Sequence, residues 1–151
     1  MDAYPWASVL LILLAIIFSA FFSGSETTLF SLSNYKIQTF LKQNGNRGIF
    51  KTLVESPRKV MISILLANNF VNILSASIAE PFFKRIFHTY IGEVGSGILS
   101  VGLMTTIILI FGEILPKAVA LPKNEILAKY VSTPINFLCL ISAPLRFFIE
   151  K

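Results

Sequence analysis

The sequence predicts an all-α membrane protein with three transmembrane helices. Of its 151 residues, 54% are hydrophobic and only 14% are charged. The mean hydropathy is +0.73, outside the range of ordinary soluble domains. Three apolar runs each approach the length of about 20 residues that crosses a hydrocarbon layer of about 30 Å. We therefore expect residues 1–151 to form one transmembrane domain.

The first span is expected over about residues 6–32, where VLLILLAIIFSAFF forms its centre. Trp6 lies at its start, and tryptophan commonly anchors a helix at the membrane interface. The run is too long for a cleaved signal peptide and lacks the basic residues that begin one. We therefore interpret it as a permanent membrane helix.

Two further spans are predicted over about residues 58–79 and 96–116. Ser56 and Pro57 precede the first of these and are typical of a helix start. That helix is expected to end near Pro81, and the glycine-rich run GEVGSG then predicts a loop before the last span.

The connection over about residues 34–55 predicts a pair of short amphipathic helices rather than a plain loop. Asn44 and Gly45 separate two apolar patterns of helical spacing. The first consists of Ile37, Phe40 and Leu41, and the second of Ile49, Phe50, Leu53 and Val54.

The basic residues predict how the chain is oriented, because short cytoplasmic loops collect lysine and arginine. Many lie between the first two spans or after the third: Lys36, Lys42, Arg47, Lys51, Arg58, Lys59, Lys117, Lys123 and Lys129. The loop between the second and third spans holds only Lys84 and Arg85. The N-terminus and that loop are therefore expected outside, and the C-terminal part in the cytoplasm.

The segment over about residues 124–149 is apolar enough for a fourth span, but its charges and prolines favour a helix lying at the cytoplasmic interface. Basic residues lie toward both ends, and prolines interrupt it: Lys129, Arg146, Lys151, Pro134 and Pro144. The single cysteine, Cys139, excludes an intrachain disulfide and is expected to face lipid.

Polar residues inside the spans predict a site for a cation. A carboxylate at membrane depth costs roughly 2.5 to 3.5 kcal/mol and usually faces a partner or an ion path. Glu113 is the main candidate. The others are Ser19, Ser23 and Glu26 on one face of the first span, Asn68, Asn69 and Asn72 in the second, and Gly112 in the third.

Pro116 is expected to break the third span. Because proline lacks an N–H and its ring displaces the carbonyl four residues earlier, the carbonyl of Gly112 should be freed beside Glu113. Carboxylate, amide, hydroxyl and carbonyl oxygens suit Mg2+, Ca2+ or Na+ better than zinc or copper.

Three motifs in this order, FFSGSETTLFSLS, LLANNFVNIL and FGEILPK, resemble the transmembrane domain of the CNNM/CorC magnesium transporters over essentially the whole chain. The resemblance implies a homodimer in the plasma (inner) membrane, with a juxtamembrane helix that wraps each bundle like a belt. It also implies Mg2+ efflux, driven by Na+, through an inward-facing acidic cavity. Family members continue into cytoplasmic CBS domains, so either this sequence is part of a longer protein or regulation by nucleotide is absent.

Carried over residue by residue, the resemblance assigns ion-binding positions to Ser23, Asn68, Asn72, Gly112 and Glu113. Ser19, Glu26 and Asn69 are secondary ion-path candidates, and which asparagine touches the ion stays open.

Each of these assignments has a plainer alternative. Serine and asparagine in membrane helices more often bond a neighbouring helix than an ion. Glu26 has Lys36 as an alternative partner, and Glu113 has Lys117. As a whole, the chain is alternatively a membrane anchor or ion sensor for a missing cytoplasmic domain. It is not expected to be an enzyme, because no nucleophile with a base, histidine cluster or phosphate loop appears.

Overall fold

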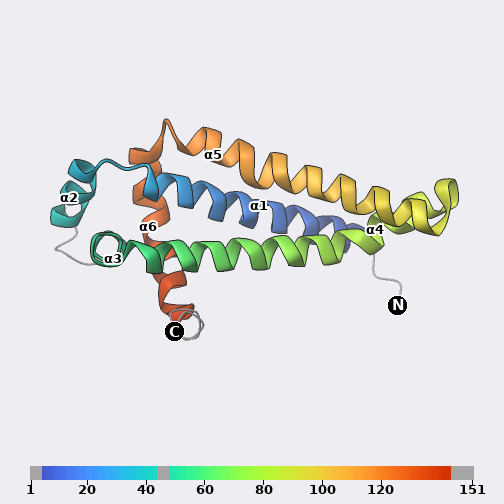
Figure 1. The fold of residues 1–151 in the computed structure, drawn as a ribbon, viewed down its shortest axis with the longest axis horizontal. Helices are drawn as coiled ribbons and strands as arrows, with labels where there is room; N and C mark the ends of the chain where they lie inside the picture. Colours follow the sequence, from blue (N-terminus) through green and yellow to red (C-terminus); the bar gives the residue numbers. More distant parts are fainter. Residues whose placement is uncertain (1–4, 44–47, 144–151) are drawn as a thin grey trace. The chain divides into compact units, whose positions relative to one another are not determined.

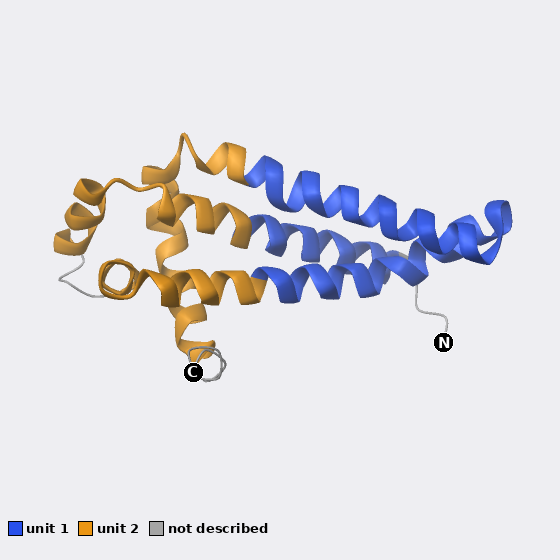
Figure 2. Cartoon of the chain, viewed as in Figure 1, with its two compact units in different colours: residues 1–21, 68–116 blue, residues 22–67, 117–151 orange. Residues whose placement is uncertain are grey.

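The computed structural model describes residues 5–43 and 48–143, and its regular elements are all helical. The chain divides into two compact units, drawn in different colours in Figure 2. Unit 1 comprises Met1–Phe21 and Asn68–Pro116, and unit 2 comprises Phe22–Ala67 and Lys117–Lys151.

The helices follow one another with short connections, as Figure 1 traces. In chain order they are α1 (Pro5–Phe30), α2 (Asn34–Gln43), α3 (Ile49–Glu55), α4 (Pro57–Ile107), the π-helix η1 (Ile108–Ile114), α5 (Leu115–Ala120) and α6 (Asn124–Ile141). The prediction of an all-helical chain is confirmed for the described residues.

In the part of the chain that the structure describes, two stretches of helix are long and apolar enough to cross a membrane. They are Trp6–Phe30, with 25 residues, and Pro57–Ala120, with 64 residues. At a rise of 1.5 Å per residue the second would extend for about 96 Å, roughly three times the thickness of a hydrocarbon layer. It therefore holds more than one membrane length.

The long stretch turns back on itself at Gly92, where φ is 70° and ψ is −175°. This conformation is essentially restricted to glycine. Figure 1 shows the second leg running back from the turn in the direction opposite to the first, with α1 drawn between them. The predicted loop over GEVGSG is wrong, because the helix resumes directly after Gly92. The predicted end near Pro81 is also wrong, because the first leg continues through that proline. A membrane helix tolerates such a residue where neighbouring groups satisfy the freed backbone.

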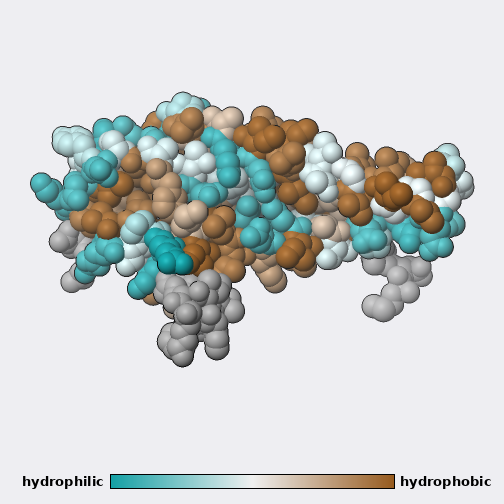
Figure 3. Space-filling model, in the orientation of Figure 1, coloured by the Kyte–Doolittle hydropathy of each residue, from teal (hydrophilic) through white to brown (hydrophobic). Residues whose placement is uncertain are grey.

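Unit 1 has a small apolar core beneath a largely exposed apolar surface. Ile12 of α1 packs with Ala79 and Met104 from the two legs of α4. Phe70 and Ile73, by contrast, are each 68% exposed, and apolar surface covers much of the face drawn in Figure 3. Exposed apolar area of this extent fits contact with lipid or with another protein surface.

The pair of short helices in unit 2 forms as predicted. The rings of Phe40 in α2 and Phe50 in α3 stack at 5.0 Å between centroids, and Ile49 and Leu53 are buried beside them. Val54 departs from the prediction, because it is 46% exposed. Asn44, Gly45 and Arg47 lie outside the described residues.

Helix α6 begins at Asn124, as predicted, and is amphipathic. Its buried residues recur every three or four positions and so share one face: Ala128, Val131, Ile135 and Cys139. Cys139 is therefore buried against protein rather than facing lipid, and that expectation is wrong. Pro134 is accommodated inside the helix. The predicted continuation to residue 149, with Pro144, Arg146 and Lys151, lies outside the described residues.

Hydrogen bonds attach both ends of α6 to the rest of unit 2. The side-chain amide of Asn124 donates to the carbonyl of Ser31 at 3.0 Å and to its hydroxyl at 2.9 Å. At the other end, the hydroxyl of Ser142 donates to that of Ser63 at 2.8 Å. These contacts fix where α6 lies against the end of α1 and the start of α4.

Candidate cation site

Gly112 and Glu113 lie in the π-helix η1, where the helical turn is wider than in an α-helix. The N–H of Leu115 bonds the carbonyl of Ile110, five residues earlier. Single π turns of this kind occur often at functional sites. The turn adds a residue to the helix at the position that carries the acidic side chain.

The predicted break at Pro116 is not what the structure shows, because the chain continues as α5 directly after η1. Pro116 is the second residue of α5. Proline has no N–H to bond the carbonyl four residues earlier, and here the wider π turn directly precedes it. The helix is therefore widened before the proline rather than unwound by it.

A chain of hydrogen bonds in unit 1 joins α1, α4 and η1. The hydroxyl of Ser19 donates to Oδ1 of Asn72 at 2.7 Å, and Nδ2 of Asn72 donates to Oε1 of Glu113 at 3.1 Å. A longer contact of 3.4 Å runs from Ser19 to Oδ1 of Asn68. Three predicted site residues, Asn68, Asn72 and Glu113, are thus linked with Ser19 in one chain of contacts.

Gly112 allows α1 to approach the π-helix closely. A Cβ atom at this position would lie 2.6 Å from Oγ of Ser19 and 3.2 Å from its Cβ. Both distances are too short for ordinary contact, so only glycine fits without displacing Ser19. This close approach holds Ser19 within reach of Asn72.

The three asparagines differ in burial, and Asn72 is the one that contacts Glu113. Asn72 is half-buried and touches Glu113, which is also half-buried, whereas Asn68 is only 8% exposed and Asn69 is exposed. Ser23 is fully buried one turn beyond Ser19 in α1, in the part of that helix assigned to unit 2.

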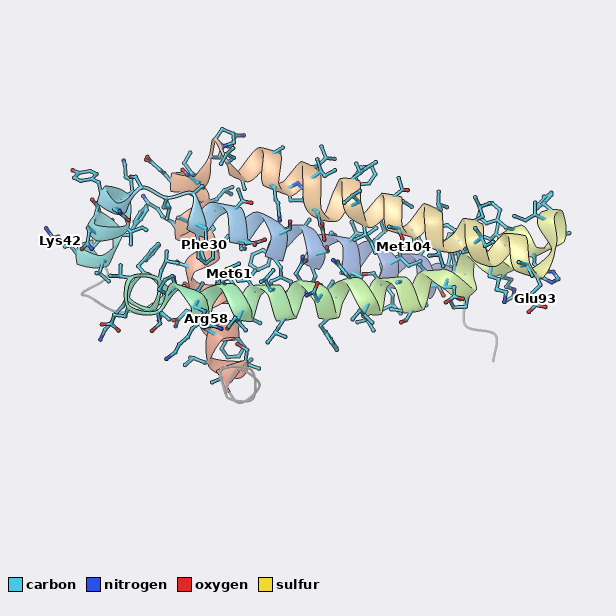
Figure 4. The ribbon with its side chains drawn as sticks, in the orientation of Figure 1. Phe30, Lys42, Arg58, Met61, Glu93 and Met104 are labelled. Carbon is cyan, nitrogen blue, oxygen red and sulfur yellow. The ribbon has the colours of Figure 1, made fainter. Side chains whose placement is uncertain are left out.

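Glu26, a secondary candidate, has a lysine partner in unit 2. Its Oε2 lies 3.1 Å from Nζ of Lys117. The pair borders a surface hollow of about 410 Å³, which Phe30 and Met61, labelled in Figure 4, also line.

This pairing corrects two of the plainer alternatives. Lys36, suggested as a partner of Glu26, instead lies 2.9 Å from the carboxylate of Glu125 in α6. Lys117, suggested as a partner of Glu113, pairs with Glu26. The carboxylate of Glu113 meets the amide of Asn72.

The cluster contains oxygen atoms that can bind a cation through their lone pairs. A carboxylate, an amide oxygen and a hydroxyl each have two or more lone pairs, and each keeps acceptor capacity when it takes part in one hydrogen bond. Among the described residues no group of three His, Cys, Asp or Glu side chains comes together. One carboxylate surrounded by neutral oxygens suits an ion that must also leave, because conduction requires binding that is not too tight.

Sequence reasoning ranked Ser19 below Ser23, whereas the structure places Ser19 at the centre of the hydrogen-bond chain. The signal was present, because Ser19 shares a helical face with Ser23 and Glu26. What the sequence does not contain is the contact with Gly112, which depends on how two helices pack.

In the residues that the structure describes, membrane-length apolar helices with a polar cluster between them define a helical membrane domain. The family model described as the Cyclin M transmembrane N-terminal domain matches residues 10–151. The chain therefore belongs to the CNNM family, to which the CorC proteins and the UPF0053 proteins are related, and the resemblance seen in its three motifs is confirmed.

Several relatives extend this comparison. A UPF0053 protein of Haemophilus influenzae is 38% identical over 148 residues, which cover 96% of this chain and 34% of the relative. The UPF0053 inner membrane protein YfjD of Escherichia coli is 34% identical over 85% of this chain and 27% of its own length. A Haemophilus influenzae protein named polyamine export protein is 26% identical over 95% of this chain and 35% of its own. The chain spans about a third of the length of these relatives.

Proposed function

We propose that this domain forms the ion path of a Mg2+ efflux transporter, with Na+ as the coupling ion. The observation that carries the proposal is the contact between Glu113 and Asn72, with Ser19 bonded to the same amide. Glu113 supplies the negative charge, and Asn72, Asn68 and Ser19 supply neutral oxygens. Ser23 is assigned an ion-binding role by the family resemblance alone.

The chemistry of the cluster favours a small hard cation. Mg2+ takes oxygen ligands at about 2.1 Å, usually keeps several waters, and is commonly held by only one or two carboxylates. A single acid with amide and hydroxyl oxygens matches that pattern. Alternating access then requires two conformations with different ion preference, and the wide turn of η1 is the element whose rearrangement would move Glu113.

The family and the distribution of basic residues support a proposed oligomeric state, membrane and orientation. The domain is a homodimer in the inner membrane, with its N-terminus outside and its C-terminal part in the cytoplasm. Each copy has three spans, formed by α1 and by the two legs of the hairpin, with α6 lying at the cytoplasmic interface. The relative named for polyamine export makes an organic polycation the competing substrate.

Ion flux into and out of liposomes tests the proposal. Purified protein is reconstituted, and the movement of Mg2+ and of spermidine is measured separately. We expect Mg2+ flux that Glu113→Gln abolishes, because this change removes the charge but keeps the shape. Glu93→Gln is the matched control, since Glu93 is an exposed acid at the hairpin turn, and it should leave the flux unchanged.

The other outcomes contradict the proposal in distinct ways. Equal Mg2+ flux in Glu113→Gln and parent removes the role assigned to Glu113. Flux of spermidine without Mg2+ makes the domain a polyamine exporter. A parent that moves neither ion supports the membrane anchor or ion sensor.

A further inference from the structure

We propose that Glu80 and the hollow beside it form a second, outward-facing cation site, from which the ion is released after leaving Glu113. The proposal rests on the transport function proposed above and adds a site to it. Glu80 lies in the first leg of the hairpin, and nothing in the cluster around Glu113 uses it.

The hollow lies between the two legs of the hairpin in unit 1. Ile73, Ser77 and Glu80 line it from the first leg, and Met104 and Ile108 are among the residues that line it from the second. Met104 is labelled in Figure 4.

The hollow extends from Ile73 to Glu80 along the first leg and from Ser100 to Ile108 along the second. Ile73 directly follows Asn72 in the chain, and Ile108 is the first residue of η1. Glu80 lies eight residues beyond Asn72, which is about 12 Å along a helix of 1.5 Å rise. Glu80 is therefore the first acidic side chain that follows Asn72 along the first leg toward the turn.

Glu80 has no protein partner among the described residues. The nearest base along the helix, Lys84, is four residues farther on and lies 3.4 Å from the carboxylate of Glu93 instead. An acidic side chain in a membrane-length helix carries a penalty of roughly 2.5 to 3.5 kcal/mol at the bilayer centre. Water and a cation that enter the hollow would offset that penalty.

The size of the hollow and its polar lining residues, Ser77, Glu80, Ser100 and Thr105, suit a partly hydrated divalent cation. Its volume is about 250 Å³, whereas six waters occupy about 180 Å³ at about 30 Å³ each. The hydroxyl of Ser77 donates to the carbonyl of Ile73 at 2.9 Å and keeps its lone pairs for a ligand or its waters. Mg2+ binds readily through waters and one carboxylate.

A sided transport measurement tests the release site. Vesicles of one orientation carry the parent, Glu80→Gln or the control Glu93→Gln, and Mg2+ is varied on each side. Mg2+ added on the side of the Gly92 turn should inhibit efflux. We expect Glu80→Gln to raise the Mg2+ concentration that gives half-maximal inhibition at least fivefold. On the opposite side, the Mg2+ concentration that half-saturates transport should change by less than twofold. Glu93→Gln should leave both concentrations unchanged. Equal shifts on both sides, or none, overturn the proposal.

A labelling measurement separates this proposal from the transport function. Ser77→Cys is introduced with Cys139→Ala, and an impermeant thiol reagent is added from each side. Labelling is expected from the hairpin side, slowed at least threefold by Mg2+, and no longer slowed after Glu80→Gln. If Mg2+ protects the introduced thiol while the parent moves no cation, the transport function fails and the site stands. If transport is intact and Mg2+ gives no protection, the release site is wrong.

Discussion

Gly112 shows how a single missing Cβ atom allows the site to form. Its backbone lies against Ser19, which in turn reaches Asn72. A larger residue would push α1 away from η1, and the hydrogen bond between Ser19 and Asn72 would lengthen. The glycine therefore acts by leaving room for the side chain of Ser19.

We predict that Gly112→Ala lowers Mg2+ flux at least fivefold while the protein stays folded. The added Cβ would lie 2.6 Å from Oγ of Ser19, and overpacking of this kind costs about 1 to 3 kcal/mol. Liposome flux and thermal unfolding in detergent are measured together. Gly102→Ala is the matched control, because nothing lies within 4 Å of a Cβ at that position. Equal flux in the two variants would contradict the steric explanation.

At the scale of elements, α6 is held to unit 2 by polar contacts at each end and by its buried apolar face between them. Asn124 makes two hydrogen bonds to Ser31, and Lys36 of α2 reaches Glu125 in the same first turn. The ion pair is well exposed on both sides and contributes little. Asn124 is therefore the main polar attachment of the helix start.

Asn124→Ala is expected to lower the free energy of unfolding by about 1 to 3 kcal/mol, because two hydrogen bonds of about 0.5 to 1.5 kcal/mol each are lost. Denaturation of the purified protein in detergent measures the change. Ser132→Ala serves as the control, since that hydroxyl bonds only the carbonyl of Lys129 in its own helix. A loss no larger than the control's would show that the apolar face alone holds α6.

The sequence allows the helices to be predicted better than the contacts between them. Apolar runs and the spacing of residues such as Phe40 and Phe50 predicted α1 to α3 closely. The turn at Gly92 was not predictable, because Gly92, Gly95 and Gly97 have the same local signal and only Gly92 has a positive φ among them. The π-helix was also missed, because its hydrogen-bond register is not encoded by a local pattern of apolar residues.

At the scale of the whole molecule, the distribution of basic residues predicts the orientation in the membrane, and that orientation sets the direction of the proposed transport. The basic residues of the first connection and of the C-terminal part are expected on the cytoplasmic side, and the turn at Gly92 outside. The family and the membrane-length helices support a membrane location. The direction of efflux in the proposal depends on this orientation.

Single cysteines at two exposed positions labelled in Figure 4 test the orientation. In a Cys139→Ala background, an impermeant thiol reagent added to intact cells should label Glu93→Cys and leave Lys42→Cys unlabelled until the membrane is opened. Labelling of Lys42→Cys in intact cells would reverse the assigned direction of transport.

The single-residue turn at Gly92 also fixes the phase of one leg of the hairpin against the other. Asn72 precedes it and Glu113 follows it at nearly equal distances along the chain. Inserting one residue beside Gly92 would rotate the following helix by about 100° and slide it by about 1.5 Å. The amide and the carboxylate would then point in different directions although every side chain of the cluster was still present. The number of residues between Asn72 and Glu113 therefore determines the geometry of the cation cluster as much as the identity of its side chains does.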